Sequence, residues 1–400
     1  SDTLGEDPQD EPALRLRPWC GIGLARGHAG IMPRYAPTVT ALADRLAART
    51  LELVDIPSVS GSEDAIRAHL LALVPPVLTP EYAGDEAFFF VPRNRRDVPL
   101  VLLVGHYDTV PAQDNLPGEI RAGAVHGLGA SDMKGGVAVA LELVRDLAAR
   151  APGPYDVGLV LFGREELPSE HNPLPALLAG SSTIHDTTLA IVLEPTDGRI
   201  EAGCLGNVIA RLVFRGTSGH SARPWLADSA IERAVAGIAP LLKLAPRAAV
   251  AGGLEFKEVV SVTRLESGIA DNVIPGQATA TVNLRYPPDR TPEQAEAYLR
   301  SLTPAGATLE ISSNAAPARV VTDSSLVRAL RVAGDLAIEP KQAWTNVADF
   351  TAKGIDAVNF GPGHTAYAHR RDELVEIDAL VHAYETLDRF LGTPIGEDAA

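Results

Sequence analysis

The sequence has few cysteines and few positive charges for its length. Only two of its 400 residues are cysteine, Cys20 and Cys204. Two cysteines are too few for a disulfide framework and favour a reducing, cytoplasmic environment. The formal net charge of −16 disfavours nucleic acid and anionic membrane surfaces as partners. It says less about small anions, because a few arginines can dominate a single pocket.

The sequence also lacks an apolar run as long as the ~18 residues that a membrane helix needs. The first residues, SDTLGEDPQDEP, are acidic and do not have the layout of a signal peptide. Residues 1–35 show no sustained hydrophobic period. We expect them to be an N-terminal extension without stable structure, with Met32 as a candidate natural start.

Buried strands and helices alternate in the rest of the chain. Apolar residues at helical spacing predict a helix over residues 38–53, and a Ser/Glu signal near Ser62 predicts the cap of a second helix. Continuous apolar runs then end in polar residues, as in PLVLLVGHYDTV (residues 99–110). Such runs are typical of strands buried on both faces of a parallel sheet. The sequence therefore predicts an α/β fold with a mostly parallel sheet.

The pattern changes between residues 207 and 315. Segments such as NVIARLVFRGTSGH and ATATVNLRY alternate with period two, as half-exposed antiparallel strands do. Helical stretches lie between and after them. We therefore expect an inserted α+β domain over 207–315, and a large domain formed by residues 36–206 and 316–400.

Polar side chains stand where the apolar runs end. They are His106, Asp108, Asp132, Glu165, Glu166, Glu194 and His369. Ligands of open α/β sheets bind beyond the carboxyl ends of the strands, so these groups are expected in one crevice. That many carboxylates would repel one another without a cation. Two zinc ions fit the count, because each accepts about four nitrogen and oxygen ligands, a water included.

A bridging carboxylate, with one histidine and one further carboxylate for each ion, uses five of these residues. Asp132 is the natural bridge. Asp108, two residues beyond His106, is then free to accept the other N–H of that imidazole. Glu165 and Glu166 need separate roles, one on a metal and one near the attacking water. The residues alone leave the order of these two open.

Each motif alone has a simpler interpretation. An isolated His-x-Asp or Glu-Glu pair is usually a structural or solvated feature, and a metal-free binding or scaffold protein could use the same fold. The joint appearance of the motifs at successive strand ends favours a metal site. A nucleotide site is disfavoured, because the turn GLGASDMKGG has Asp132 where a dinucleotide motif needs its third glycine.

Taken in order, the motifs resemble those of the dinuclear zinc aminoacylase/carboxypeptidase family. The matching segments are GHYDTVP, GLGASDMKGG, GREE, LEPTDGRIEAGCLG, GTSGHSARPWLADSAI, DNVIPGQATATVNLRY and AVNFGPG followed by AHRRDE. The resemblance covers residues 38–390 and is greatest to desuccinylases of the actinobacterial type. It implies hydrolysis of N-succinyl-LL-2,6-diaminopimelate for lysine and cell-wall synthesis. Deacylation of another substrate, such as acetylornithine, and cleavage of a small peptide stay open.

The resemblance also implies a role for each metal-site residue. It implies two zinc ions per subunit, for which cobalt can substitute. The implied ligands are His106, Asp132 and Glu194 for one ion, and Asp132, Glu166 and His369 for the other. Glu165 is then the general base, and the peptide bond between Asp132 and Met133 is cis. His364 stands close to His369 as a second imidazole.

Further residues are implied to bind substrate in a homodimer. His220, in the inserted domain, is implied to reach the partner's active site and stabilise the oxyanion; the simpler alternative is a histidine in a surface turn. The implied substrate-binding residues are Asn272, Arg285, Thr345 and Gly363. An arginine fork suits a substrate carboxylate, although a surface ion pair is the alternative. The segment AWTNVADF departs from the Gly-Thr-Ser-Asp stretch of many desuccinylases, because Asn346 and Asp349 alter the charge of the pocket.

Overall fold

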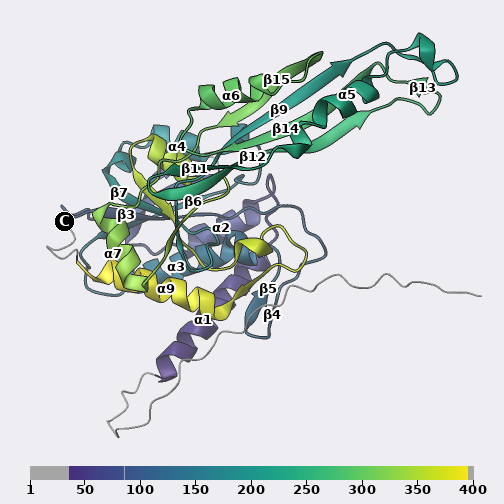
Figure 1. Ribbon diagram of the computed structural model, residues 1–400. Helices are drawn as coiled ribbons and strands as arrows, with labels where there is room; N and C mark the ends of the chain where they lie inside the picture. The colour runs from purple at the N-terminus through teal and green to yellow at the C-terminus, as the bar shows by residue number, and fades with distance from the viewer. Residues whose placement is uncertain (1–35, 85, 395–400) are drawn as a thin grey trace, which may run out of the picture.

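The computed structural model describes residues 36–84 and 86–394 of the chain. The extension expected over residues 1–35, with Met32, lies outside the described residues. The chain forms a large unit and an elongated inserted unit that projects from it (Figure 1). No helix in the described part of the chain is long and apolar enough to cross a membrane.

An eight-stranded sheet forms the centre of the large unit. Its strands, in spatial order, are β1 (Leu78–Ala83), β2 (Ala87–Pro92), β6 (Asp156–Phe162), β3 (Leu100–His106), β7 (Thr187–Val192), β17 (Asp356–Asn359), β8 (Ile200–Ala202) and β16 (Ile338–Pro340). The neighbours β6, β3, β7 and β17 pair in parallel. The prediction of an α/β fold with a mostly parallel sheet is confirmed.

Helices cover both faces of this sheet. One face carries α1 (Ala36–Val54), α2 (Asp64–Leu73), α3 (Gly135–Ala148), α7 (Ser325–Gly334) and α9 (Ile377–Gly392), and the other carries α4 (Leu174–Gly180) and α8 (Val347–Ala352). Along β3, Val101 and Leu103 pack into the first layer, while Leu102 and Val104 pack into the second. Successive side chains of a strand point to opposite faces, so a strand between two helical layers is apolar throughout.

The two N-terminal helices test the predicted boundaries. The helix predicted over 38–53 is α1. The predicted second helix is α2, which begins at Asp64, close to Ser62, but its N-cap, Glu63, makes no side-chain capping hydrogen bond. The backbone N–H of Ser62 instead donates to the carbonyl oxygen of Val59 at 2.8 Å, which closes a turn before the helix.

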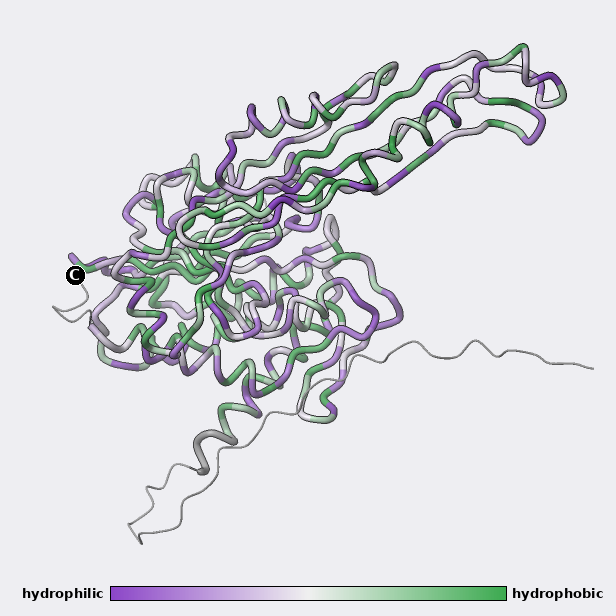
Figure 2. Tube along the Cα trace, in the orientation of Figure 1, coloured by the Kyte–Doolittle hydropathy of each residue, from purple (hydrophilic) through white to green (hydrophobic). Residues whose placement is uncertain are grey.

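The inserted unit is built on a five-stranded antiparallel sheet. Its strands, in spatial order, are β11 (Arg247–Ala251), β12 (Leu254–Ser267), β14 (Gln277–Tyr286), β9 (Gly206–Arg215) and β15 (Ala307–Ala315). Helices α5 (Ala230–Ile238) and α6 (Pro292–Ser301) pack on one face of it. Figure 2 shows hydrophobic residues gathered in the middle of the large unit, while polar and apolar residues mix along these strands.

Two short sheets complete the fold. At the far end of the inserted unit, β10 (Gly219–His220) pairs with β13 (Val273–Ile274). In the large unit, β18 (Leu374–Glu376), β5 (Ala124–His126) and β4 (Glu119–Arg121) form a three-stranded sheet. Figure 1 places β13 at the tip of the inserted unit, far from β3 and β7.

Candidate metal centre and active site

Four of the expected site residues lie at or just beyond the carboxyl ends of parallel strands. His106 is the last residue of β3, and Glu194 stands two residues after β7. Glu165 and Glu166 lie in a turn after β6, which ends at Phe162. The alternation of side chains along a strand therefore does not apply to these two residues. The turn sets their separate directions.

The other expected donors come from loops. Asp132 lies in the short kinked turn that leads into α3, and its peptide bond to Met133 is cis, as the resemblance implied. The carboxylate of Glu373 fixes this turn, because it accepts the backbone N–H groups of Gly129, Ser131 and Asp132 at 3.0 Å each. Glu373 thus holds the backbone of Asp132 in place independently of any ligand bound by the Asp132 side chain.

The donor side chains form two triads that share Asp132. The candidate ligand atoms of His106, Asp132 and Glu194 lie within 4.8 Å of one another, as do those of Asp132, Glu166 and His369. Nε2 of His106 is 3.2 Å from Oδ1 of Asp132. Nε2 of His369 is 3.4 Å from Oδ2 of the same carboxylate and 2.8 Å from Oε1 of Glu166. Asp132 therefore presents one oxygen to each triad, as a bridging ligand does.

The electrostatics of the triads fit divalent cations. Burial and the charge of Asp132 raise the pKa of Glu194 to about 7. Hydrogen bonds with Asp132 and Glu166 raise the pKa of His369 to about 10. Burial accounts first for the shift of Glu194, and the shift of His369 reports the negative field of Asp132 and Glu166. The side chains of Asp132, Glu166 and Glu194 are at most 12% exposed. Such a field attracts metal ions, and the nitrogen and oxygen donors suit them.

Glu165 is adjacent to the triads without belonging to either of them. One of its carboxylate oxygens lies within 4.8 Å of ligand atoms of His106 and Glu166. Burial, and then the charges of Glu194 and Glu166, hold the pKa of Glu165 well above its ordinary range. A carboxyl group of this kind can take up a proton and give it back, which is what a general base in hydrolysis must do.

Asp108 has a wider role than the predicted contact with His106. Nδ1 of His106 lies 3.2 Å from the carbonyl oxygen of Asp108 and 3.4 Å from its Oδ1. The carboxylate also accepts the Ser60 hydroxyl at 2.6 Å and the backbone N–H groups of Glu165 and Glu166 at 3.0 and 3.2 Å. Burial would raise the pKa of Asp108, but these bonds and His106 hold it below its ordinary value. Asp108 therefore orients two parts of the site together.

We expect Asp108→Asn to weaken both metal binding and hydrolysis by about 10- to 100-fold. Both carboxylate oxygens of Asp108 accept backbone N–H groups, and an amide of the same size must turn its NH2 toward one of them. Zinc titration of metal-free protein and steady-state kinetics check this. Ser60→Ala, which removes a single donor, is the matched control with a smaller expected loss. Wild-type metal affinity in Asp108→Asn would contradict the role of Asp108.

Of the expected substrate-binding residues, Gly363 lies beside the metal-site turn, and Thr345 and Arg285 both lie near Cys204. Gly363, with φ of 91°, passes so close to the metal-site turn that a Cβ would lie 2.5 Å from Oγ of Ser131. The carbonyl oxygen of Thr345 accepts the Cys204 thiol at 3.7 Å. Arg285, on β14, lies near enough to Cys204 to interact with it electrostatically. The inserted unit therefore delivers Arg285 to the neighbourhood of Thr345.

Two expected residues are not brought to the triads of the same chain. His220 is exposed on β10, and the backbone N–H of the next residue, Ser221, donates to the carbonyl oxygen of Asn272 at 3.0 Å. Both His220 and Asn272 thus lie beside β13 at the tip of the inserted unit (Figure 1). His364 is also apart, because its Nδ1 lies 3.2 Å from Oδ1 of Asp197 and no donor group found among the described residues includes it.

The departure AWTNVADF places a side-chain contact at the start of α8. The buried side chain of Asn346 donates through Nδ2 to Oδ2 of Asp349 at 2.9 Å. Burial raises the pKa of Asp349 to about 6. The added carboxyl group therefore carries its full charge only above that pH.

Three supporting side chains were not singled out from the sequence. They are Ser60, Lys134 and Glu373. Lys134 is buried and donates through Nζ to the carbonyl oxygen of Ile56 at 2.9 Å, which ties the metal-site turn to the chain after α1. Burial lowers the pKa of Lys134 to about 7. Lys134 and Glu373 stand inside the motifs GLGASDMKGG and AHRRDE, but nothing local in those motifs identifies their distant partners.

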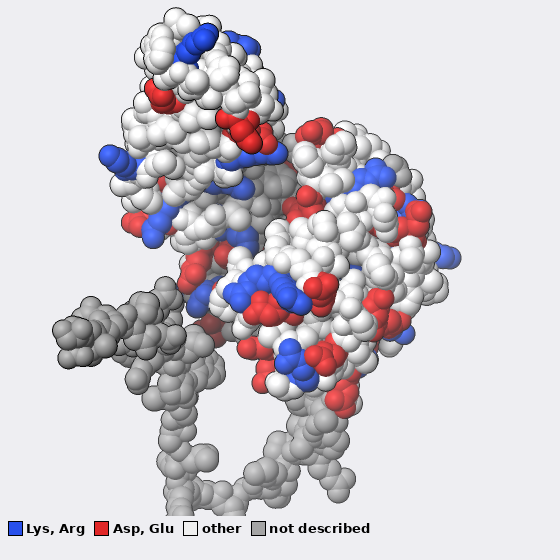
Figure 3. All heavy atoms as spheres, turned by 90° about the vertical axis from the view of Figure 1, so that its right-hand side faces the viewer, with Lys and Arg blue, Asp and Glu red and all other residues white. Residues whose placement is uncertain are grey.

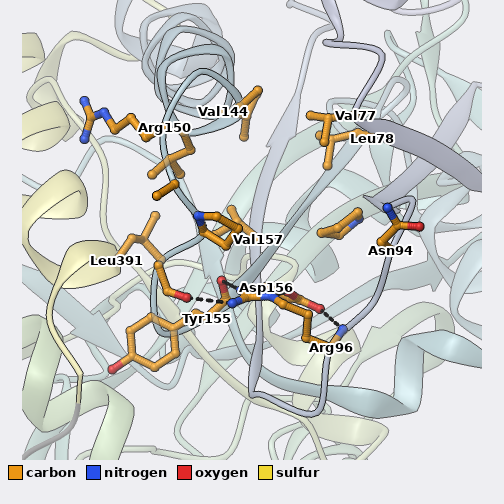
Figure 4. A pocket seen from close by; sticks show the side chains of 16 residues that line it. Val77, Leu78, Asn94, Arg96, Val144, Arg150, Tyr155, Asp156, Val157 and Leu391 are labelled. Carbon is orange, nitrogen blue, oxygen red and sulfur yellow. Dashed lines mark hydrogen bonds and ion pairs between the residues drawn. The ribbon is translucent and has the colours of Figure 1, made fainter.

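A separate cavity of about 310 Å³ lies away from this site. Figure 4 shows its lining, which includes Asp156 and Val157 at the start of β6, the end of the strand opposite to the donors. Its charged groups are already engaged, because Nε of Arg96 donates to Asp156 at 2.8 Å and Arg150 pairs with Asp388. The cavity therefore adds nothing to the metal centre.

Comparisons with known proteins identify the family of the chain. Residues 102–393 match the family model of peptidase family M20/M25/M40. The chain belongs to this family. Family membership makes it a metal-dependent hydrolase of amide bonds, as the resemblance implied.

Curated relatives extend the match over most of the chain. A succinyl-diaminopimelate desuccinylase of Corynebacterium glutamicum is 34% identical over 361 residues, which cover 86% of this chain and 95% of the relative. A Mycobacterium tuberculosis protein named for the same activity is 36% identical over 354 residues, or 86% of this chain and 97% of the relative. The predicted resemblance to desuccinylases of the actinobacterial type is confirmed.

Solved structures share the fold. An M20 family metallo-carboxypeptidase from Sulfolobus solfataricus aligns with a TM-score of 0.69 at 18% identity, over 87% of this chain and 99% of that one. An aminopeptidase from Bacillus cereus aligns with a TM-score of 0.69 at 16% identity, over 88% and 98%. At such identities the likeness establishes the architecture alone.

Proposed function

We propose that the protein is a cytoplasmic, zinc-dependent desuccinylase that hydrolyses N-succinyl-LL-2,6-diaminopimelate to succinate and LL-2,6-diaminopimelate. The observation that carries this proposal is the pair of triads sharing Asp132. The proposed substrate is supported by the 34–36% identity, over 86% of the chain, to relatives named for that activity. In this proposal the product diaminopimelate feeds lysine and cell-wall synthesis.

Two ions, zinc or in its place cobalt, are proposed to occupy the triads. One is assigned to His106, Asp132 and Glu194, and the other to Asp132, Glu166 and His369. When bound, such ions supply positive charge that acidifies a water and polarises a carbonyl group. The crowded carboxylates of the site support this assignment, because their repulsion is relieved by cations.

The chain's own residues then handle the proton. Glu165 is proposed to take a proton from the water that attacks the amide carbonyl carbon, and to return it to the leaving amine nitrogen. The attack forms the new C–O bond, and protonation of the nitrogen accompanies cleavage of the C–N bond. Asp108 supports this role because it holds the backbone N–H of Glu165.

We further propose that the protein works as a homodimer formed through the inserted unit. Beyond Val259, β12 pairs only with β14 in the described chain, so its other edge is open to a second copy. Trp225 and Ile269, near the tip, are 75% and 83% exposed. A partner would cover these surfaces and would bring its His220 to the triads of the first subunit, where it could stabilise the oxyanion.

Hybrid dimers test whether His220 acts across the interface. His220→Ala and Glu165→Gln homodimers should each be nearly inactive. In a hybrid dimer, one of the two active sites combines an intact Glu165 with an intact His220 from the other subunit. Random pairing makes about half of the dimers hybrids, so coexpression should restore about a quarter of wild-type activity. Coexpression of both variants and a rate assay check this, with sedimentation to establish the dimer. A mixture that stays inactive would contradict a shared site.

A substrate panel tests the proposed activity. The purified protein with added zinc is assayed on N-succinyl-LL-2,6-diaminopimelate, acetylornithine and small peptides. The succinyl substrate should give the highest kcat/KM, and a chelator should abolish turnover until zinc is restored. Preference for acetylornithine or a peptide would replace the proposed substrate, and turnover that survives the chelator would contradict the metal.

A further inference from the structure

Arg285 is a half-buried cation of the inserted unit. It lies on β14, and none of the ion pairs among the described residues includes it. Burial lowers its pKa, so the environment disfavours the charge that an arginine nonetheless keeps. A guanidinium in that position is stabilised when an anion arrives, and its planar fork matches a carboxylate.

Two asparagines hold this guanidinium in one orientation. Nε of Arg285 donates to Oδ1 of Asn283 at 2.9 Å, and Nδ2 of Asn283 donates to Oδ1 of Asn207 at 2.6 Å. Arginine has no acceptor, so it must meet the oxygen of Asn283, and the amide of Asn283 must then face the oxygen of Asn207. These hydrogen bonds can therefore run in one direction only, from Arg285 through Asn283 to Asn207.

Arg285, Asn283 and Asn207, together called the relay below, lie on the face of the inserted sheet that its helices leave uncovered. Asn207 and Arg285 are direct cross-strand partners on β9 and β14, and Asn283 is two residues from Arg285 on the same face. The neighbouring Leu284 and Tyr286 point into the helix-covered core. The open face looks toward the large unit, where Figure 3 shows a hollow with Lys and Arg along its inserted-unit side.

We propose that Asn283 and Asn207 are positioning residues that orient the Arg285 guanidinium, and that the oriented guanidinium selects acyl groups ending in a carboxylate. With Nε committed to Asn283, the terminal NH2 groups are left for the ligand. This inference rests on the proposed function and adds the residues that fix its acyl specificity. Neither asparagine belongs to a metal-site triad, so we expect their effect to fall on selection and not on the chemical step.

The test compares two acyl groups on the same amine. N-succinyl- and N-acetyl-LL-2,6-diaminopimelate differ in the distal carboxylate that Arg285 would bind. Asn283→Ala should lower kcat/KM for the succinyl compound by about 10- to 100-fold, mainly through KM, because a charge-assisted pair loses its geometry. Its kcat/KM for the acetyl compound should stay within about twofold. Asn207→Ala should show the same change to a smaller extent.

A matched asparagine of the same sheet serves as the control. Asn314, on β15, accepts the Tyr286 hydroxyl at 2.9 Å and donates to Pro292 and Glu296, so it stabilises the inserted unit without contacting Arg285. Asn314→Ala should leave the succinyl-to-acetyl ratio unchanged. A change in that ratio equal to the change in Asn283→Ala would assign the effect to general loosening of the sheet and overturn the relay.

Binding of succinate alone separates this inference from the proposed function. Calorimetry on the wild type and on Asn283→Ala needs no turnover, and the variant should bind succinate at least 10-fold more weakly. Equal binding, or an unchanged succinyl-to-acetyl ratio in an active enzyme, would overturn the relay and leave the desuccinylase proposal standing. A wild type that binds succinate through Asn283 but hydrolyses neither compound would support the relay and refute the proposed reaction.

Discussion

Replacing Glu165 with glutamine is expected to lower kcat by about 10²- to 10⁴-fold while leaving the metal content unchanged. Glutamine has the same size and keeps the backbone N–H that Asp108 accepts at 3.0 Å. It cannot take a proton from the attacking water. Steady-state kinetics and elemental analysis of the same preparation check the two parts of this prediction.

Glu166→Gln is the matched control for that experiment. The two residues are adjacent in one turn, but only Glu166 belongs to one of the two triads that share Asp132, with Oε1 at 2.8 Å from Nε2 of His369. Its replacement should lower the metal content as well as the rate. A Glu165→Gln protein with a near-wild-type rate would contradict the general base. Loss of metal from Glu165→Gln, with retention in Glu166→Gln, would reverse the two assignments.

The site residues at the strand ends were predictable, because a polar residue is conspicuous at the end of a buried, apolar strand. A strand between two helical layers, such as β3, has to be apolar, so a histidine at its last position stands out. The same reasoning led to Glu194 after β7. The period-two pattern likewise indicated antiparallel strands, and β9 and β15 are neighbours in an antiparallel sheet. The domain boundaries 207 and 315 stay a prediction.

The supports of the site were not predictable, because they are contacts between segments far apart in the chain. Ser60 meets the carboxylate of Asp108 across 48 residues, and Glu373 meets the backbone of Asp132 across 241. Neither position differs locally from an ordinary loop serine or surface glutamate. The position of Glu165 in a turn was not predictable either, because a strand ends where its ladder of hydrogen bonds stops, and the residues after Phe162 do not reveal that point.

Asp132 is the one residue whose loss should disable both halves of the centre. It presents Oδ1 to His106 and Oδ2 to His369, so its removal leaves each triad with a single histidine and a single carboxylate. We expect Asp132→Ala to lose both metal ions on dialysis. Its kcat/KM should fall by at least about 10³-fold, because the charge that assists attack on the carbonyl is worth several kcal/mol.

Elemental analysis of the dialysed variant measures this directly, with Glu194→Ala as the control. Glu194 belongs to one triad only, so its replacement should weaken one ion and spare the other. A melting curve with and without zinc adds a readout independent of turnover, since zinc should raise the Tm of the wild type and not that of Asp132→Ala. Full metal occupancy in Asp132→Ala would show that the two triads do not depend on a shared carboxylate.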